Sequence, residues 1–212
     1  MQHTCPLCLH DQTVAYHQDK RRHYFQCEQC QLVFADPSTL LPPQAEVSQY
    51  NLHQNDHNDI GYRRFLNRLC EPLLERLALE QKGIDFGCGP GPTLSLMLEE
   101  QQPKVALYDP YFHPDRSVLR ERYDFITCTE AIEHFYRPAR EWQLFLDMLN
   151  HGGWLGIMTK LVKSPEAFGN WHYKNDPTHV SFFSEATFEF LAQRDGFELE
   201  FIGQDVILMQ KH

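Results

Sequence analysis

A glycine-rich turn directly after a short apolar run is the feature that most constrains the fold of this 212-residue chain. The run covers residues 83–86, the turn extends from Gly87 to Gly91, and apolar residues at helical spacing begin after Pro92. Glycines permit positive φ angles and let a ligand approach the backbone, and a helix N-terminus offers unpaired N–H groups. The order of strand, glycine turn and helix predicts a nucleotide-binding sheet edge, although a tight turn without a ligand gives the same pattern.

Strand-like and helix-like patterns alternate along the rest of the chain. Apolar residues over 62–77 have the spacing of an amphipathic helix, with Asn58 or Asp59 available as its cap. The later elements are strands at 105–108, 123–128 and 154–159, a helix from Pro138 that Gly152 and Gly153 end, a helix from Ser184 to Gly196, and a hairpin of 197–202 and 206–209. We expect an α/β fold with a Rossmann-like, doubly wound, mostly parallel sheet and a C-terminal antiparallel hairpin.

Two carboxylates beside the glycine turn narrow the choice of ligand. Asp109 ends the strand after the turn, 18 residues beyond Gly91, where a carboxylate can accept hydrogen bonds from a ribose diol. Asp85 precedes the turn, whose glycine spacing is G-x-G-x-G rather than the G-x-G-x-x-G that binds pyrophosphate. A carboxylate at this place repels pyrophosphate but suits the ammonium group of a methionine moiety.

With these motifs the chain resembles the class I S-adenosylmethionine (SAM)-dependent methyltransferases. Residues 123–134 resemble the fourth motif of that family, Gly152-Gly153 matches its late glycine pair, and the resemblance extends from about Tyr62 to the C-terminus. The resemblance implies methyl transfer from SAM, with Asp109 binding the ribose and Thr129 and Glu130 beside the methionine part. The cofactor-binding residues that it implies are Asp85, Gly87, Cys88, Gly89, Gly91, Asp109, Pro110, Tyr111, Thr129 and Glu130.

One segment departs from the family pattern. Only 13 residues separate Asp109 from Tyr123, too few for the usual helix, third strand and second helix, so residues 117–119 are at most a remnant of that strand. The acid that the family often supplies near the adenine has no counterpart here. Tyr111 and Phe112 could stack on the adenine ring, or they could pack under a short loop.

Four of the seven cysteines have the spacing of a metal site. Cys5-x2-Cys8 and Cys27-x2-Cys30 form two short knuckles, 18 residues apart, whose thiolates can complete a tetrahedral zinc site. Four thiolates leave no coordination position open, so we expect structural zinc in a small ribbon over residues 1–43. We interpret residues 44–61 as a linker or lid and 62–212 as the methyltransferase domain.

A loop after the strand at 154–159 gathers aromatic and titratable residues between positions 171 and 183. Loops at this sheet edge usually build the acceptor pocket. In similar methyltransferases a histidine of this loop faces the active site, so His179 is the first candidate for a general base and His172 the second. Alternatively, His179 only fixes the loop by hydrogen bonds to the backbone.

Charge and composition guide the expectation about partners. The net charge is -10 and no basic patch is evident, which favours a small organic acceptor over nucleic acid. An RNA base methyltransferase and a non-catalytic SAM-binding or protein-interaction module are the alternatives, and a zinc ribbon does not decide between them. Without a secretory signal or an apolar run of membrane-spanning length, we expect a cytoplasmic protein that does not enter membranes.

Overall fold

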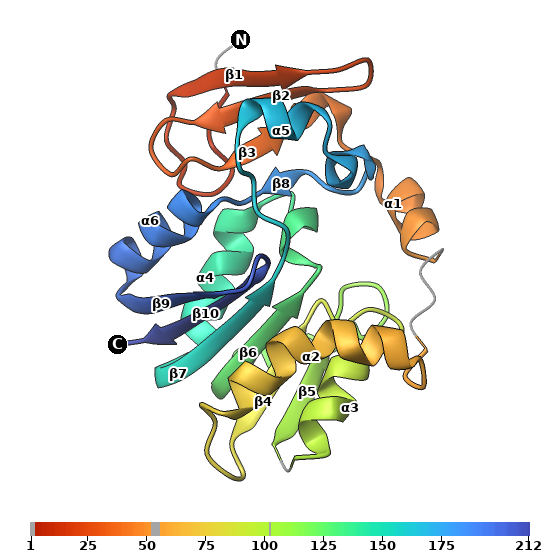
Figure 1. The fold of residues 1–212 in the computed structure, drawn as a ribbon, viewed down its shortest axis with the longest axis vertical. Helices are drawn as coiled ribbons and strands as arrows, with labels where there is room; N and C mark the ends of the chain where they lie inside the picture. The colour runs from red at the N-terminus through yellow and green to blue at the C-terminus, as the bar shows by residue number, and fades with distance from the viewer. Residues whose placement is uncertain (1–2, 52–55, 102) are drawn as a thin grey trace.

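The structure, a computed structural model, describes residues 3–51, 56–101 and 103–212. A six-stranded sheet with the order β5-β4-β6-β7-β10-β9 forms the centre of the molecule (Figure 1). Its strands are β4 (Lys82–Phe86), β5 (Lys104–Tyr108), β6 (Tyr123–Thr129), β7 (Leu149–Met158), β9 (Phe197–Ile202) and β10 (Val206–Lys211). The first four pair in parallel, and β10 pairs antiparallel with β7 and β9. This confirms the predicted α/β fold with its C-terminal hairpin.

Helices cover both faces of this sheet (Figure 1). On one face α2 (Ile60–Leu74) and α3 (Thr93–Glu99) pack together, and on the other lie α4 (Pro138–Met148) and α6 (Glu185–Asp195). Phe125 and Ile126 are neighbours on β6 but are buried in two different core clusters, because successive strand residues point to opposite faces. Within the described ranges, no helix has the length and apolar content needed to cross a bilayer.

Local sequence signals set the ends of the main helices. The side chain of Asp59 accepts hydrogen bonds from the N–H groups of Gly61 and Tyr62, so α2 begins at the predicted cap. Ser184 and Thr187 form a capping box at the start of α6, and Gly196 ends that helix with a φ of 75°. These caps satisfy backbone groups that a helix end otherwise leaves without partners.

The N-terminal ribbon is joined to the rest of the molecule through a strand. Its strands β1 (Thr13–Gln18), β2 (His23–Cys27) and β3 (Val33–Ala35) are antiparallel, and β8 (Ser181–Phe182) extends the sheet in the order β1-β2-β3-β8. Leu32 and Phe34 are buried in the same core cluster as Phe145 and Phe188. The short helix α5 (Pro165–Gly169) and the 3-10 helix η4 (His172–Asn175) precede β8 and lie close to the ribbon (Figure 1).

The predicted end of one helix was wrong. Helix α4 ends at Met148 and β7 starts at Leu149, so Gly152 and Gly153 lie inside the strand, where the β6–β7 register shifts and Gly152 has a φ of 76°. The glycines therefore form an irregularity within the strand instead of ending a helix. Residues 117–119, which the sequence allowed at most as a strand remnant, belong to a short connection that folds as the 3-10 helix η2 (Val118–Arg120).

The segment predicted as an aperiodic linker or lid contains a helix. Helix α1 (Pro43–Tyr50) begins at a proline, and Glu46 is the one residue that it buries. Because the helix buries no apolar face, the sequence has no apolar repeat from which to predict it. Residues 52–55 of the same segment, like residues 1–2 of the predicted ribbon, lie outside the described residues.

Candidate functional site

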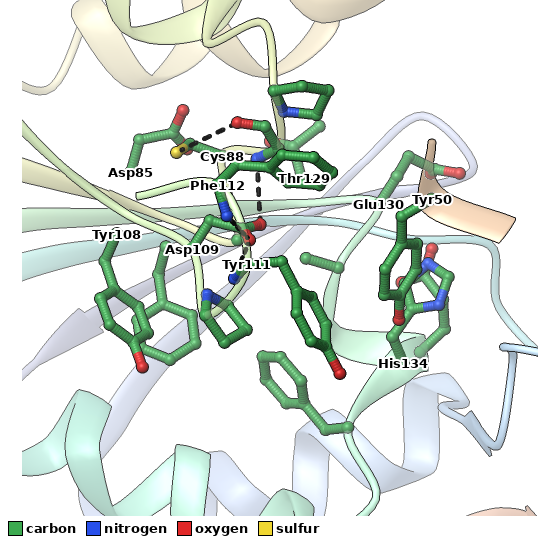
Figure 2. Close-up of a pocket in the computed structure, with 18 of the residues that line it drawn as sticks. Tyr50, Asp85, Cys88, Tyr108, Asp109, Tyr111, Phe112, Thr129, Glu130 and His134 are labelled. Atoms are coloured by element: carbon green, nitrogen blue, oxygen red, sulfur yellow. Dashed lines mark hydrogen bonds between the residues drawn. The ribbon is translucent and has the colours of Figure 1, made fainter. Parts of the chain in front are cut away.

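A cavity of about 660 Å³ opens where β4, β5 and β6 end. The carboxyl edge of a parallel sheet is the usual ligand-binding place in such folds. The cavity lining includes all ten residues that the sequence predicts to bind the cofactor: Asp85, Gly87, Cys88, Gly89, Gly91, Asp109, Pro110, Tyr111, Thr129 and Glu130. Most of these side chains appear in Figure 2. The fold therefore brings the motifs of three strand ends together around one space.

The glycine turn has the conformation that its residue types suggested. Gly87 and Gly89 have φ angles of 76° and 65°. A Cβ atom added to Gly87 would lie 2.5 Å from the Cβ atom of Ala131, so this position has no room for a side chain. The N–H of Gly87 donates to the carbonyl of Tyr108 at 2.8 Å, which ties the turn to the end of β5.

Asp109 is oriented by the backbone around it. Its Oδ1 accepts hydrogen bonds from the N–H groups of Tyr111 and Phe112 at 2.8 and 3.0 Å, and its Oδ2 accepts from Gly89 at 3.2 Å (Figure 2). A carboxylate offers about four acceptor positions, so three backbone contacts leave capacity for a ligand hydroxyl. The same contacts fix the direction in which that capacity points.

Asp85 is a buried acid at the base of the cavity. Its side chain accepts a 2.8 Å hydrogen bond from the hydroxyl of Thr127. Burial raises the pKa of Asp85 to about 6, and the charge of Asp109 acts in the same direction, while the Thr127 hydrogen bond opposes both. A positively charged ligand beside Asp85 would favour the ionised form.

Two polar atoms of the cavity wall are buried without a hydrogen-bond partner among the described residues. They are Oγ1 of Thr129 and Oε1 of Glu130. Glu130 also has a φ of 48°, a conformation that costs a non-glycine residue about 1 to 3 kcal/mol and that clusters at functional sites. Burial raises the pKa of Glu130 to about 7, which the charge of Lys160 partly opposes. The pair fits a ligand that brings hydrogen-bond donors and positive charge, as the ammonium group of SAM does.

The far end of the cavity is aromatic and contains two histidines. The rings of His134 and His179 have centroids 4.7 Å apart, and the Tyr50 ring lies edge-on to His134 at 5.2 Å (Figure 2). The buried carboxylate of Glu46 accepts hydrogen bonds from the hydroxyls of Tyr50 and Tyr111, at 2.7 and 2.8 Å. Helix α1 is thereby attached to the loop after β5.

The two histidines predicted as candidate bases lie in different surroundings. His179 is buried and lines the cavity, and its Nδ1 is 2.7 Å from the carbonyl oxygen of Tyr173. His172 is exposed on η4, with its Nε2 3.1 Å from Nζ of Lys160, and it does not line the cavity. The structure thus leaves His179 as the candidate and places His172 at the surface.

Sequence reasoning missed several residues of this end. Glu46, Tyr50 and Tyr136 all line the cavity. Glu46 and Tyr50 are four residues apart, the spacing at which two side chains meet on a helix, and this was the signal available in the sequence. Their approach to the cavity depends on where α1 packs, which no local pattern reveals.

The four cysteines of the ribbon form one cluster, whose sulfur atoms all lie within 4.8 Å of one another. The Sγ atoms of Cys5 and Cys30 are 3.5 Å apart, and those of Cys8 and Cys27 are 3.4 Å apart. One cysteine from each knuckle contributes to each of these contacts. This donor set and spacing fit a tetrahedral zinc site. Cys70 and Cys128 are buried elsewhere.

Comparisons with known proteins agree with this fold. The model of a family described as methyltransferase domain matches residues 62–200. No curated protein matches the chain. A solved structure of Burkholderia thailandensis 1,6-didemethyltoxoflavin-N1-methyltransferase, with bound 1,6-didemethyltoxoflavin and S-adenosylhomocysteine, is 14% identical. The match covers 93% of this chain and 98% of that one, with a TM-score of 0.54.

A second similar structure is magnesium protoporphyrin IX methyltransferase from Synechocystis PCC 6803 with bound S-adenosylhomocysteine. It is 10% identical, with 80% of this chain and 94% of that chain covered and a TM-score of 0.49. The family match covers well over half of the 212 residues and includes the glycine turn, the two strand-end acids and the fourth motif. The chain therefore belongs to the methyltransferase domain family, as a class I SAM-dependent methyltransferase.

Proposed function

We propose that this protein transfers the methyl group of SAM to a small organic acceptor bound beside His134 and His179. The observation that carries the proposal is the single cavity, which connects all ten predicted cofactor-binding residues with this histidine and aromatic end. SAM supplies the electrophilic methyl group of its sulfonium. The chain has to hold the cofactor and the acceptor in line, and such positioning accounts for much of the rate of a transfer reaction.

The cofactor half of the cavity offers one group for each part of SAM except the adenine. The Asp109 carboxylate accepts hydrogen bonds from the ribose hydroxyls, and the glycine turn admits the cofactor close to its backbone. Asp85 and Glu130 supply negative charge for the ammonium group, and the buried Oγ1 of Thr129 gains a partner there. Tyr111 is engaged with Glu46 through its hydroxyl, so we assign it to the boundary between cofactor and acceptor.

At the acceptor end, His179 is our candidate for a general base. A peptide carbonyl can only accept a hydrogen bond, so the Nδ1 atom that faces the Tyr173 carbonyl must carry a proton. The lone pair of the neutral imidazole is then on Nε2, the atom that can take a proton from an acceptor hydroxyl or amine. His134 lies beside it and shapes the same space.

The size and charge of the site support a small acceptor. The net charge of -10 disfavours the phosphate backbone of RNA, and the Burkholderia enzyme of similar fold holds 1,6-didemethyltoxoflavin, a small organic molecule. We propose in addition that the four cysteines bind structural zinc. A cytoplasmic location is part of the proposal, because reducing compartments keep free thiols.

Calorimetric titration with SAM tests the function, followed by transfer of labelled methyl groups to a collection of phenols, amines, sugars and RNA. We expect Asp109→Ala to weaken SAM binding about tenfold or more, because it removes a charged hydrogen-bond acceptor. Asp115→Ala is the matched control, since this acid belongs to the same loop but does not line the cavity. If SAM fails to bind the parent protein, or if only RNA is methylated, the proposal is wrong.

A further inference from the structure

Three side chains with metal-binding groups meet at the acceptor end of the cavity. One ligand atom from each of Glu133, His134 and His179 lies within 4.8 Å of the other two. The residues come from two distant segments, which the hydrogen bond from the N–H of Val180 to the carbonyl of Glu133 holds together at 2.9 Å. Two imidazoles and one carboxylate are a donor set that binds zinc, iron and similar divalent ions.

Both imidazoles are oriented as metal-binding histidines usually are. The Nδ1 atom of His179 lies 2.7 Å from the carbonyl of Tyr173, and that of His134 lies 3.2 Å from the carbonyl of Thr178. Each Nδ1 therefore carries the proton, and each neutral ring has its lone pair on Nε2. Histidines that bind metals almost always donate the second ring N–H to a carbonyl or carboxylate, which fixes the ring direction.

The carboxylate of Glu133 is also held in place. It is 1% exposed, its Oε2 accepts a 3.0 Å hydrogen bond from the hydroxyl of Thr159, and its Oε1 accepts from the hydroxyl of Tyr173. Each oxygen keeps a further acceptor position. No lysine or arginine forms an ion pair with Glu133 within the described ranges, so a bound cation would supply the missing countercharge.

We propose that Glu133, His134 and His179 bind a divalent transition-metal ion that is separate from the zinc of the four cysteines. Three protein ligands leave coordination positions open toward the cavity, which Glu46 and Tyr50 also line. Oxygen atoms suit these positions, so the acceptor class is a small molecule with a hydroxyl group next to a second oxygen.

This inference rests on the proposed function and names its acceptor class. The ion holds the acceptor by its oxygens and lowers the pKa of the hydroxyl, whose proton passes to water. The hydroxyl oxygen then forms its bond to the methyl carbon as the carbon–sulfur bond of SAM breaks, which releases S-adenosylhomocysteine. In the metal-loaded protein, His179 acts as a ligand and the ion replaces it in promoting proton loss.

Titration of the metal-free protein with Co²⁺ tests the site, because cobalt bound to thiolates absorbs strongly in the near ultraviolet and cobalt bound to histidine and carboxylate does not. We expect about two equivalents per chain, one of each spectral type. His134→Ala and His179→Ala should each lose the equivalent without thiolate absorption, and Cys8→Ser should lose the other. His172→Ala, which changes an exposed histidine outside the cavity, is the control and should bind both.

A single equivalent with thiolate absorption in the parent protein overturns the inference, and this result does not depend on any variant being folded. SAM calorimetry on the same samples separates the two proposals. If SAM binds without a second metal ion, the inference fails and the proposed function stands. If the second ion binds but SAM does not, the proposed function fails. His134→Gln gives a second, milder variant if an alanine variant does not fold.

Discussion

The guanidinium of Arg22, in the N-terminal ribbon, donates a 2.8 Å hydrogen bond to the backbone carbonyl of His179. It also donates to the carbonyl of Pro177, and Arg22 itself is 7% exposed. In the same region, Nζ of Lys174 forms a 2.7 Å ion pair with Asp19, which is on the ribbon. The ribbon therefore contacts the loop that carries the candidate base, in addition to the β3–β8 pairing.

Replacing Arg22 should affect both stability and the acceptor site. Arg22→Ala leaves the buried carbonyl of His179 and the half-buried carbonyl of Pro177 without their charged donor. We expect a loss of about 2 kcal/mol in the free energy of unfolding by denaturant titration. Methyl transfer should fall more than SAM affinity does, because the contact is on the acceptor side. Arg21→Ala is the control, since Arg21 is exposed and its guanidinium lies 3.4 Å from the carbonyl of Asn175, a longer contact than that of Arg22 with His179. Equal effects of the two variants would contradict the assigned role.

Removal of the proposed zinc should disturb the acceptor loop as well as the ribbon. The ribbon shares β8 and a core cluster with the rest of the chain, so its unfolding would expose residues such as Phe34 and Phe183. We expect Cys8→Ser to lower the melting temperature of the whole protein in a single transition followed by circular dichroism. A separate early transition with unchanged methyl transfer would show that the ribbon is independent.

Binding of SAM should weaken in acid because Asp85 must be ionised to hold the ammonium group. The pKa of Asp85 is raised to about 6 in the free protein, so affinity should fall about tenfold for each pH unit below that value. Calorimetry between pH 5 and 8 measures this. Thr127→Val should move the midpoint to higher pH, because it removes the hydrogen bond that favours the charged form. Asp85→Asn should remove the midpoint near pH 6 and leave the dependence that Glu130 causes, whose pKa is raised to about 7. A midpoint that stays near pH 6 in that variant would assign it to another group.

The raised pKa of Asp85 makes the stability of the free protein depend on pH in the opposite direction to SAM binding. Because the folded pKa lies above the ordinary value of 3.8, the folded state binds the proton more tightly than the unfolded chain does. The contribution of Asp85 to stability is therefore full below about pH 4 and is lost as the pH rises through about 6. Comparison of denaturant midpoints for the parent and Asp85→Asn across this range isolates that contribution.

Substitutions at Gly87 and Gly152 can distinguish a steric clash from backbone strain. Both glycines have a φ of 76°, so the strain that a side chain adds is similar at the two positions. At Gly87 a new Cβ atom would meet Ala131 at 2.5 Å, whereas at Gly152 nothing lies within 4 Å. We expect Gly152→Ala to cost about 1 kcal/mol of stability from strain alone and to bind SAM normally. Gly87→Ala should cost more and should lose SAM binding in calorimetry. Similar behaviour of both variants would mean that strain, and not the contact with Ala131, dominates.

Much of the fold was predictable because its signals are local. The cap at Asp59, the end of α6 at Gly196 and the turn at Gly87 depend on residues close together in the sequence. The alternation of strands and helices then limits the sheet to a few arrangements. The wrong end assigned to α4 at Gly152 shows the weakness of this approach, since a glycine with positive φ serves a bulged strand as well as a helix end.

The sequence by itself determined the α/β fold, the family and the sheet edge that we propose to bind the cofactor. Parallel strands bring their carboxyl ends, and so Asp85, Asp109 and Thr129, to one side of the sheet. Only the tertiary structure decided the acceptor end. Three contacts there join segments that are far apart in the chain. His134 packs against His179, Glu46 accepts a hydrogen bond from Tyr111, and Arg22 donates one to the carbonyl of His179. Such contacts depend on how whole elements pack, and neither periodicity nor motif spacing encodes that packing.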